Sequence, residues 1–228
     1  MSRPIYGPLF KYCRTLARLF YRPYETDFAN ELKGPVVYVG HHQNLFGPFI
    51  IYHSFPIDVR CWILHVFLEK KACFHHYRNY TFQKRFGWGK WLSNSLAFLL
   101  SHFVPRLLNS GKGIPVYRGT RQIMQTLKQS LDALKNGESI AIFPSIDYKS
   151  NEETIGAIYE GFLSIEKYYF KETGQHLSFV PVYVSKAKRK IFVGEPITFS
   201  KEVPFAKERK NVSDKLRLAI NELQRTCG

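Results

Sequence analysis

The chain has 228 residues, of which 45% are hydrophobic and 16% aromatic, and its 33 Lys and Arg against 18 Asp and Glu give a formal net charge of +15. This length fits one α/β domain or two small ones, and we take it as one domain with a full core; the apolar content excludes a disordered chain. The charge is expected to draw the protein to phosphate-rich partners, which are nucleic acid, anionic lipid headgroups or a phosphorylated substrate.

The placement of the cysteines and the hydropathy of the chain indicate its compartment and its relation to a membrane. The four cysteines form no CxxC pair and follow no secretory leader, which predicts reduced thiols in a cytosol-facing compartment. No segment has the roughly 18 to 20 uninterrupted apolar residues that span a bilayer. The nearest candidate, residues 91–105, contains serines, an asparagine and a histidine, so we expect it to lie on a membrane surface.

The first expected element is a basic amphipathic helix in residues 5–22. Its apolar side carries Leu9, Tyr12, Cys13, Leu16, Leu19 and Phe20, and its other side carries Lys11, Arg14 and Arg18. Such a helix packs either on its own domain or in a membrane interface, and the flanking aromatic and arginine side chains favour the interface. We therefore divide the chain into a membrane-interface segment, residues 1–30, and an α/β domain, residues 31–228.

The next element is a strand, Pro35–Val39, that runs into the paired histidines His41 and His42. Pro48 suits the first turn of a following helix. The histidines therefore fall on a strand-to-helix turn, where α/β folds open ligand crevices. Because adjacent side chains of an extended segment point to opposite faces, we expect one histidine to do chemistry and the other to pack or form hydrogen bonds.

The remaining chain alternates strands and helices after an aromatic and basic stretch. Residues 60–110 are interpreted as helices and loops. The later expected elements are strand 113–119, helix 121–137 closed by Gly137, strand 139–144, helix 155–170, strands 177–185 and 190–200, and helix 213–224. This alternation predicts a mainly parallel central sheet wrapped by helices.

Four short motifs follow one another on these elements. They are His42 with Gly47 (HX4G), Arg118 ending GIPVYR, FPSI at 143–146 with Gly161 downstream, and Pro181 in VPV. In this order they resemble the glycerolipid acyltransferases, the 1-acylglycerol-3-phosphate and lysophospholipid acyltransferase family, over residues 34 to about 200. The resemblance implies the fold of glycerol-3-phosphate acyltransferases, with an insertion within 60–100.

Two motifs depart from the family pattern. Gly47 stands where the family has the aspartate of HX4D. Ser145 and Ile146 replace the glutamate and glycine of FPEG, and Tyr148 replaces the arginine that follows. The chain keeps the family's histidine, but it lacks the usual carboxylate partner and residues that the family uses around a phosphorylated acceptor.

The resemblance implies transfer of a fatty acyl chain from acyl-CoA or acyl carrier protein to a hydroxyl of a lysophospholipid or related lipid. His42 would be the general base, since His is suited to proton transfer at neutral pH. Asp147 is the first candidate for a group that replaces the missing carboxylate as the partner of His42. Asp58, Glu160 and His41 are weaker candidates.

Substrate contacts are expected from the second and third motifs. An arginine that ends a strand grips a phosphate with its planar guanidinium, which makes Arg118 the main candidate. The other candidates are Arg121, Ser145, Lys149 and Gly161. No cofactor is implied, and His75 and His76 have no Cys or acidic cluster at metal-ligand spacing.

Two other functions stay open. A catalytically degenerate member of the same family would bind lipid without chemistry, and it explains the missing carboxylates. A nucleic-acid binder would use the aromatic residues at 75–91 for stacking, but no RNP, zinc or helix-turn-helix pattern accompanies the charge. We expect a peripheral or monotopic protein on the cytoplasmic face of a membrane, with anionic lipids and no nucleic acid as partners.

Overall fold

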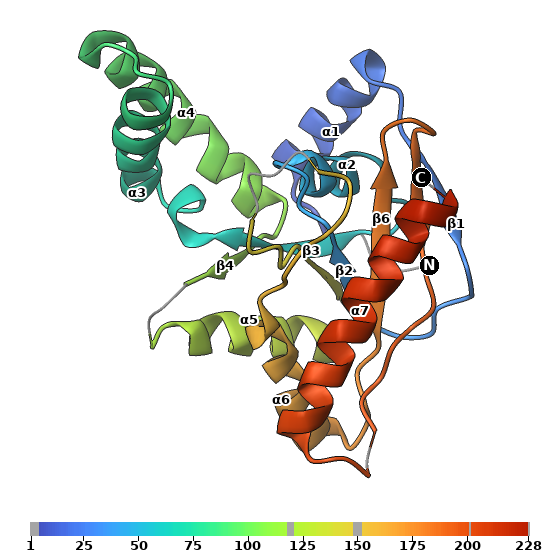
Figure 1. Ribbon diagram of the computed structural model, residues 1–228. Helices are drawn as coiled ribbons and strands as arrows, with labels where there is room; N and C mark the ends of the chain where they lie inside the picture. Colours follow the sequence, from blue (N-terminus) through green and yellow to red (C-terminus); the bar gives the residue numbers. More distant parts are fainter. Residues whose placement is uncertain (1–4, 118–120, 148–151, 201, 228) are drawn as a thin grey trace.

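The computed structural model describes residues 5–117, 121–147, 152–200 and 202–227. It is an α/β fold around a seven-stranded sheet (Figure 1). The strands are β1 Glu25–Phe28, β2 Val37–Gly40, β3 Val59–Leu64, β4 Ile114–Val116, β5 Ser139–Ile142, β6 Phe179–Ser185 and β7 Lys190–Val193. The helices are α1 Pro8–Phe20, α2 Phe46–Ser54, α3 Lys70–His75, α4 Lys90–Ser110, α5 Ile123–Lys135, α6 Ser164–Thr173 and α7 Phe205–Cys227, with the 3-10 turns η1 His65–Phe67 and η3 Glu160–Leu163 and the π-helix η2 His76–Arg85.

The sheet is mainly parallel, as predicted. Its strand order is β1-β7-β6-β2-β5-β3-β4. The five strands from β6 to β4 run in one direction, whereas β7 is antiparallel to β6 and β1 follows β7. The carboxyl ends of β2, β5 and β6 therefore lie next to one another at one edge.

The core has one layer on each face of the sheet. Val37 and Val39 of β2 point into the layer formed with α5, α6 and α7, whereas Tyr38 points into the layer formed with α2. This alternation is the period-two pattern of a strand that is buried on both faces. It places α2 and the histidine turn that precedes it directly against the sheet.

The predicted strands and helices after residue 113 are confirmed in kind, with three differences in extent. The expected strand 190–200 ends at Val193, and the expected helix 213–224 begins already at Phe205. The expected helix 155–170 is wrong in its first half, because helix α6 begins only at Ser164. The Tyr159 N–H donates to the Pro144 carbonyl at 2.8 Å, and Ile158 forms an isolated bridge with Ser145. The backbone there is used to fix the FPSI loop instead of a helix.

The interpretation of residues 60–110 as helices and loops missed β3, which lies between β5 and β4. Its sequence VRCWIL mixes charged, apolar and aromatic residues, so it carries no clean alternation. We call residues 70–110, which contain α3, η2 and α4, the helical arm. The arm and α1 extend beyond the same end of the sheet, to the left and right in Figure 1.

Candidate active site

The candidate site lies where β2 and β5 end. β2 leads into His41 and His42, and β5 leads into Phe143, Pro144 and Ser145. Because the two strands are parallel neighbours, both segments leave the sheet at the same edge. The predicted strand-to-helix turn is confirmed, since α2 begins at Phe46 directly after it.

A buried hydroxyl, that of Ser145, joins the two histidines. The His41 Nε2–H donates to the Glu152 carbonyl at 2.8 Å, so the neutral His41 ring presents Nδ1 as an acceptor. The Ser145 hydroxyl lies 3.0 Å from that Nδ1 and donates to it, and Ser145 Oγ in turn accepts the His42 backbone N–H at 3.2 Å. Ser145 thereby ties the ends of β2 and β5 together.

The two histidines have different surroundings. His41 is buried, and burial lowers its pKa. The positive charge of Lys186 also lowers this pKa, whereas the hydrogen bond to the Glu152 carbonyl raises it. It is therefore a neutral structural group at pH 7. His42 is only partly buried, and its ring meets Phe143 edge to face with centroids 6.4 Å apart.

A left-handed turn fixes the His42 ring. Gln43, Asn44 and Leu45 have φ angles of 44°, 49° and 76°, a conformation that non-glycine residues rarely adopt. The turn places the Leu45 backbone nitrogen 3.1 Å from His42 Nδ1, and the Leu45 N–H donates a hydrogen bond to that atom. Nδ1 is therefore an acceptor, and the neutral His42 ring carries its proton on Nε2.

Gly47 fits this turn because it has no side chain. A Cβ at this position would collide with the carbonyl oxygen of His41. The Gly47 N–H donates to the His42 carbonyl at 3.3 Å. An aspartate side chain thus has no room at this position, and the backbone N–H of Leu45 contacts the imidazole nitrogen that a carboxylate would need.

This arrangement sets a chemical condition on proton transfer. A general base needs an unprotonated nitrogen facing the hydroxyl. In the turn described here that nitrogen is Nδ1, which already accepts the Leu45 N–H. For Nε2 to act as the base, the ring must move its proton to Nδ1 and give up the Leu45 contact.

The candidate partners of His42 lie in different places. Asp147 is exposed on the FPSI loop, two residues after Ser145. Asp58 binds Arg14 of α1 at 2.9 Å, and Glu160 forms an ion pair with Arg209 of α7 at 3.6 Å. Asp58 and Glu160 therefore hold helices, and Asp147 is the candidate that shares a loop with the site.

The expected substrate contacts are only partly brought together. Ser145 lies in the hydrogen-bond network under His42, whereas Arg121 is exposed just before α5. Gly161 lies in η3, where a Cβ would collide with the ring of Tyr159. Arg118 and Lys149 lie outside the described residues. Strand β4, which precedes Arg118, is separated from β2 by β5 and β3.

A basic residue that the motifs did not indicate is Lys186. It follows β6, the other parallel neighbour of β2, and its Nζ lies 4.7 Å from the ring centroid of Phe46 at the start of α2. Its charge contributes to the lowered pKa of His41. The signal in the sequence was its position directly after a buried strand, but the strand order was needed to use it.

Metal binding finds no support in the described part of the chain, where no three His, Cys, Asp or Glu side chains are grouped to share an ion. His75 is an exposed residue of α3. His76 packs edge to face on Phe67, with centroids 4.9 Å apart.

Helix α1 turns its two arginines toward the protein, whereas Lys11 is exposed. Arg14 binds Asp58 and donates to the Phe55 carbonyl at 3.2 Å, and Arg18 donates to the His53 carbonyl at 2.8 Å. The apolar stripe therefore faces outward. Its most exposed members are Tyr12, Leu19 and Phe20, at 68%, 76% and 84%.

Helix α4 also exposes its large apolar side chains. Its buried stripe consists of small residues at four-residue spacing, Ser93, Ala97, Ser101 and Pro105. Its large apolar residues are exposed instead, namely Trp91, Leu92, Phe98, Leu99 and Phe103. Small residues between helices and large ones outside are typical of helices that pack in lipid. No helix in the described ranges is long and apolar enough to cross a membrane.

Comparison with solved structures finds a likeness to the crystal structure of the 1-acyl-sn-glycerophosphate (LPA) acyltransferase PlsC from Thermotoga maritima. The TM-score is 0.49 and the sequence identity 18%, over 95% of this chain and 78% of that chain. No protein-family model and no curated protein matches the sequence.

Proposed function

We propose that the protein is a membrane-surface acyltransferase that moves a fatty acyl chain from acyl-CoA or acyl carrier protein to a hydroxyl of a lysophospholipid or related lipid. His42 is the general base, and it attacks no bond itself. It removes the hydroxyl proton while the oxygen adds to the thioester carbonyl, and the thiol of the donor leaves with a proton.

The observation that carries this proposal is the placement of His42. A partly exposed imidazole stands at the carboxyl ends of parallel strands, and its backbone N–H is bound by Ser145. The neighbouring His41 is neutral and buried, so only one ring of the pair faces outward. Lys186 supplies a positive charge beside α2 for a phosphate on the acceptor.

The proposed membrane side is the face that carries α1 and the helical arm. A helix that turns its arginines inward and its Leu and Phe outward would expose its apolar stripe to water, which is unfavourable. In a bilayer interface the same orientation buries that stripe in lipid. We infer that α1 and the arm hold the protein on the cytoplasmic leaflet, whose anionic lipids attract the basic chain.

A second candidate function is lipid binding without catalysis. It is favoured by the Leu45 N–H on His42 Nδ1 and by the lack of room for a carboxylate at Gly47. The Leu45 contact favours the ring with its proton on Nε2, and the tight space at Gly47 leaves no carboxylate there to favour the other tautomer. In that case His42 only completes the turn.

The two functions are separated by an acyl transfer assay with purified protein. Wild type and His42→Ala are offered labelled acyl-CoA and acyl carrier protein thioesters together with a panel of lysolipids in detergent. Transfer by wild type alone supports the acyltransferase and identifies the acceptor. No transfer to any acceptor, by protein that still binds lipid vesicles, supports the binder and contradicts the enzyme.

A further inference from the structure

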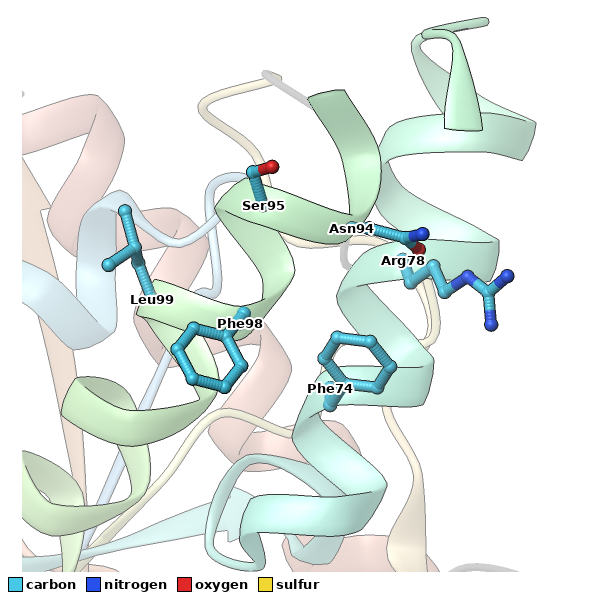
Figure 2. A pocket seen from close by; sticks show the side chains of 6 residues that line it. All are labelled: Phe74, Arg78, Asn94, Ser95, Phe98 and Leu99. Carbon is cyan, nitrogen blue, oxygen red and sulfur yellow. The ribbon is translucent and has the colours of Figure 1, made fainter. Parts of the chain in front are cut away.

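The helical arm contains a groove that takes no part in the site around His42. It lies between α4 and the pair α3 and η2, and its volume of 570 Å³ is within the usual range of ligand sites, about 300 to 1,000 Å³. Phe74 and Phe98 lie toward one end, Asn94 and Arg78 lie together toward the other, and Ser95 points away from Arg78 (Figure 2). The groove is thus apolar at one end and polar at the other.

Arg78 marks the polar end as a site for an anion. Its Nε atom is buried and has no hydrogen-bond partner among the described residues. A buried donor without a partner is unfavourable, and an anion would satisfy it with a charge-assisted hydrogen bond. Arg78 also lies in a π-helix, a rare conformation that is frequent at functional sites.

The charge of the arm selects the same kind of ligand. Residues 70–110 contain no Asp or Glu. Their basic residues are Lys70, Lys71, Arg78, Lys84, Arg85, Lys90 and Arg106. A segment with seven positive and no negative side chains attracts anions and repels cations over its whole length.

The apolar end selects a ligand that also carries a hydrocarbon chain. Phe74 and Phe98 line the groove, and Leu99 beside them is exposed. Trp91 on the same helix is 81% exposed, so the groove opens within an apolar surface. A soluble phosphate would leave this surface uncovered, whereas a lipid would cover it.

We propose that the groove binds one anionic phospholipid of the membrane. An acyl chain lies against Phe74, Phe98 and Leu99, and the phosphate accepts hydrogen bonds from Arg78 and Asn94. The bound lipid fixes the arm in the leaflet. This inference goes beyond the proposed function, because it concerns a binding site on other elements and holds whether or not His42 catalyses acyl transfer.

Photocrosslinking tests the proposal. The full chain is mixed with phosphatidylcholine vesicles that contain a small fraction of phosphatidic acid with a photoreactive acyl chain, and crosslinked peptides are mapped by mass spectrometry. We expect crosslinks on the arm at Phe74, Phe98 or Leu99. Arg78→Gln is expected to reduce them about tenfold, the loss of one charge-assisted contact. Lys84→Gln is the matched control, since Lys84 is an exposed base of the same π-helix that does not line the groove.

Three results would overturn the proposal. Equal crosslinking of a photoreactive phosphatidylcholine would show that no anionic headgroup is selected. An equal loss in Lys84→Gln would show attraction by the overall charge and no specific site. Competition by inorganic phosphate would show a phosphate site without a lipid. If Arg78→Gln fails to fold by circular dichroism, Leu99→Gln replaces it, because Leu99 is exposed, and an unchanged yield in that variant contradicts the proposed chain position.

Discussion

Ser145 stands where the resembling family has a glutamate, and it binds backbone and imidazole. We expect Ser145→Ala to lower the free energy of unfolding by about 1 to 3 kcal/mol, because it removes a donor from His41 Nδ1 and an acceptor from the His42 N–H. Urea denaturation measures the change. Ser95→Ala, on the exposed side of α4, is the control, and an equal effect of the two substitutions would contradict the role given to Ser145.

Gly47 is a position at which an aspartate, the residue of the family that the motifs resemble, is expected to destabilise the protein. Gly47→Asp would press a Cβ into the His41 carbonyl, so we expect a loss of about 1 to 3 kcal/mol in stability and no gain in acyl transfer. Gly156→Asp is the control, since nothing lies near a Cβ there. A stable and more active Gly47→Asp protein would show that the turn differs from the one described.

His41 makes stability depend on pH. Burial lowers its pKa below the ordinary 6.5, so below that pH the unfolded chain binds more protons than the folded one. The free energy of unfolding is therefore expected to fall as pH decreases through about 6.5 and to level off below the lowered pKa. His53, whose pKa burial also lowers, adds to the same trend.

The measurement compares denaturant unfolding near neutral pH with unfolding about two pH units lower. His41→Gln should show a smaller loss between the two conditions than wild type, because one of the titrating groups is gone. Identical losses in wild type and variant would mean that His41 is not protonated on unfolding in this range.

Helix α1 was expected from its period, but its orientation was not. The spacing of Leu16, Leu19 and the arginines predicts two faces, and it does not say which face meets the protein. That choice is made by Asp58, which is 44 residues away and binds Arg14. The contact depends on how β3 is placed, and β3 itself was not predicted.

The outward face of α1 should drive membrane binding. Leu19→Glu with Phe20→Glu is expected to weaken binding to anionic vesicles at least about tenfold, because each apolar side chain is worth about 1.5 to 3 kcal/mol when buried. Vesicle cosedimentation measures the change, and stability should be unaffected. Leu218→Glu is the control, because Leu218 is an exposed apolar residue of α7, at 58%. If it weakens binding as much, the membrane face is wrongly placed.

At the scale of the whole molecule, the fold class was predictable because strands after residue 113 alternate with helices. The site was predictable only in outline. Ser145 meets the histidines across more than a hundred residues, and the left-handed turn at Gln43, Asn44 and Leu45 contains no glycine from which its backbone conformation could be predicted. The tautomer of His42 depends on the backbone conformation of this turn. That conformation and the distant contacts of Ser145 are set by packing, which the local sequence does not reveal.

The whole arrangement places three features toward one end of the sheet: the outward stripe of α1, the helical arm and the turn that carries His42 (Figure 1). A reacting lipid hydroxyl and a membrane surface would then meet without the lipid leaving the bilayer. The net charge of +15 would strengthen the proposed attachment to anionic lipid, and added salt would weaken that attraction.

The most direct test of the central claim is the rate of acyl transfer by wild type and by His42→Gln on the same anionic vesicles, with the accepted thioester and lysolipid at saturation. We predict that the substitution lowers the rate about 10²-fold to 10⁴-fold, the usual contribution of a general base, while vesicle binding is unchanged. An unchanged rate in His42→Gln would contradict the role of His42 as general base, because the reaction would then proceed without the imidazole.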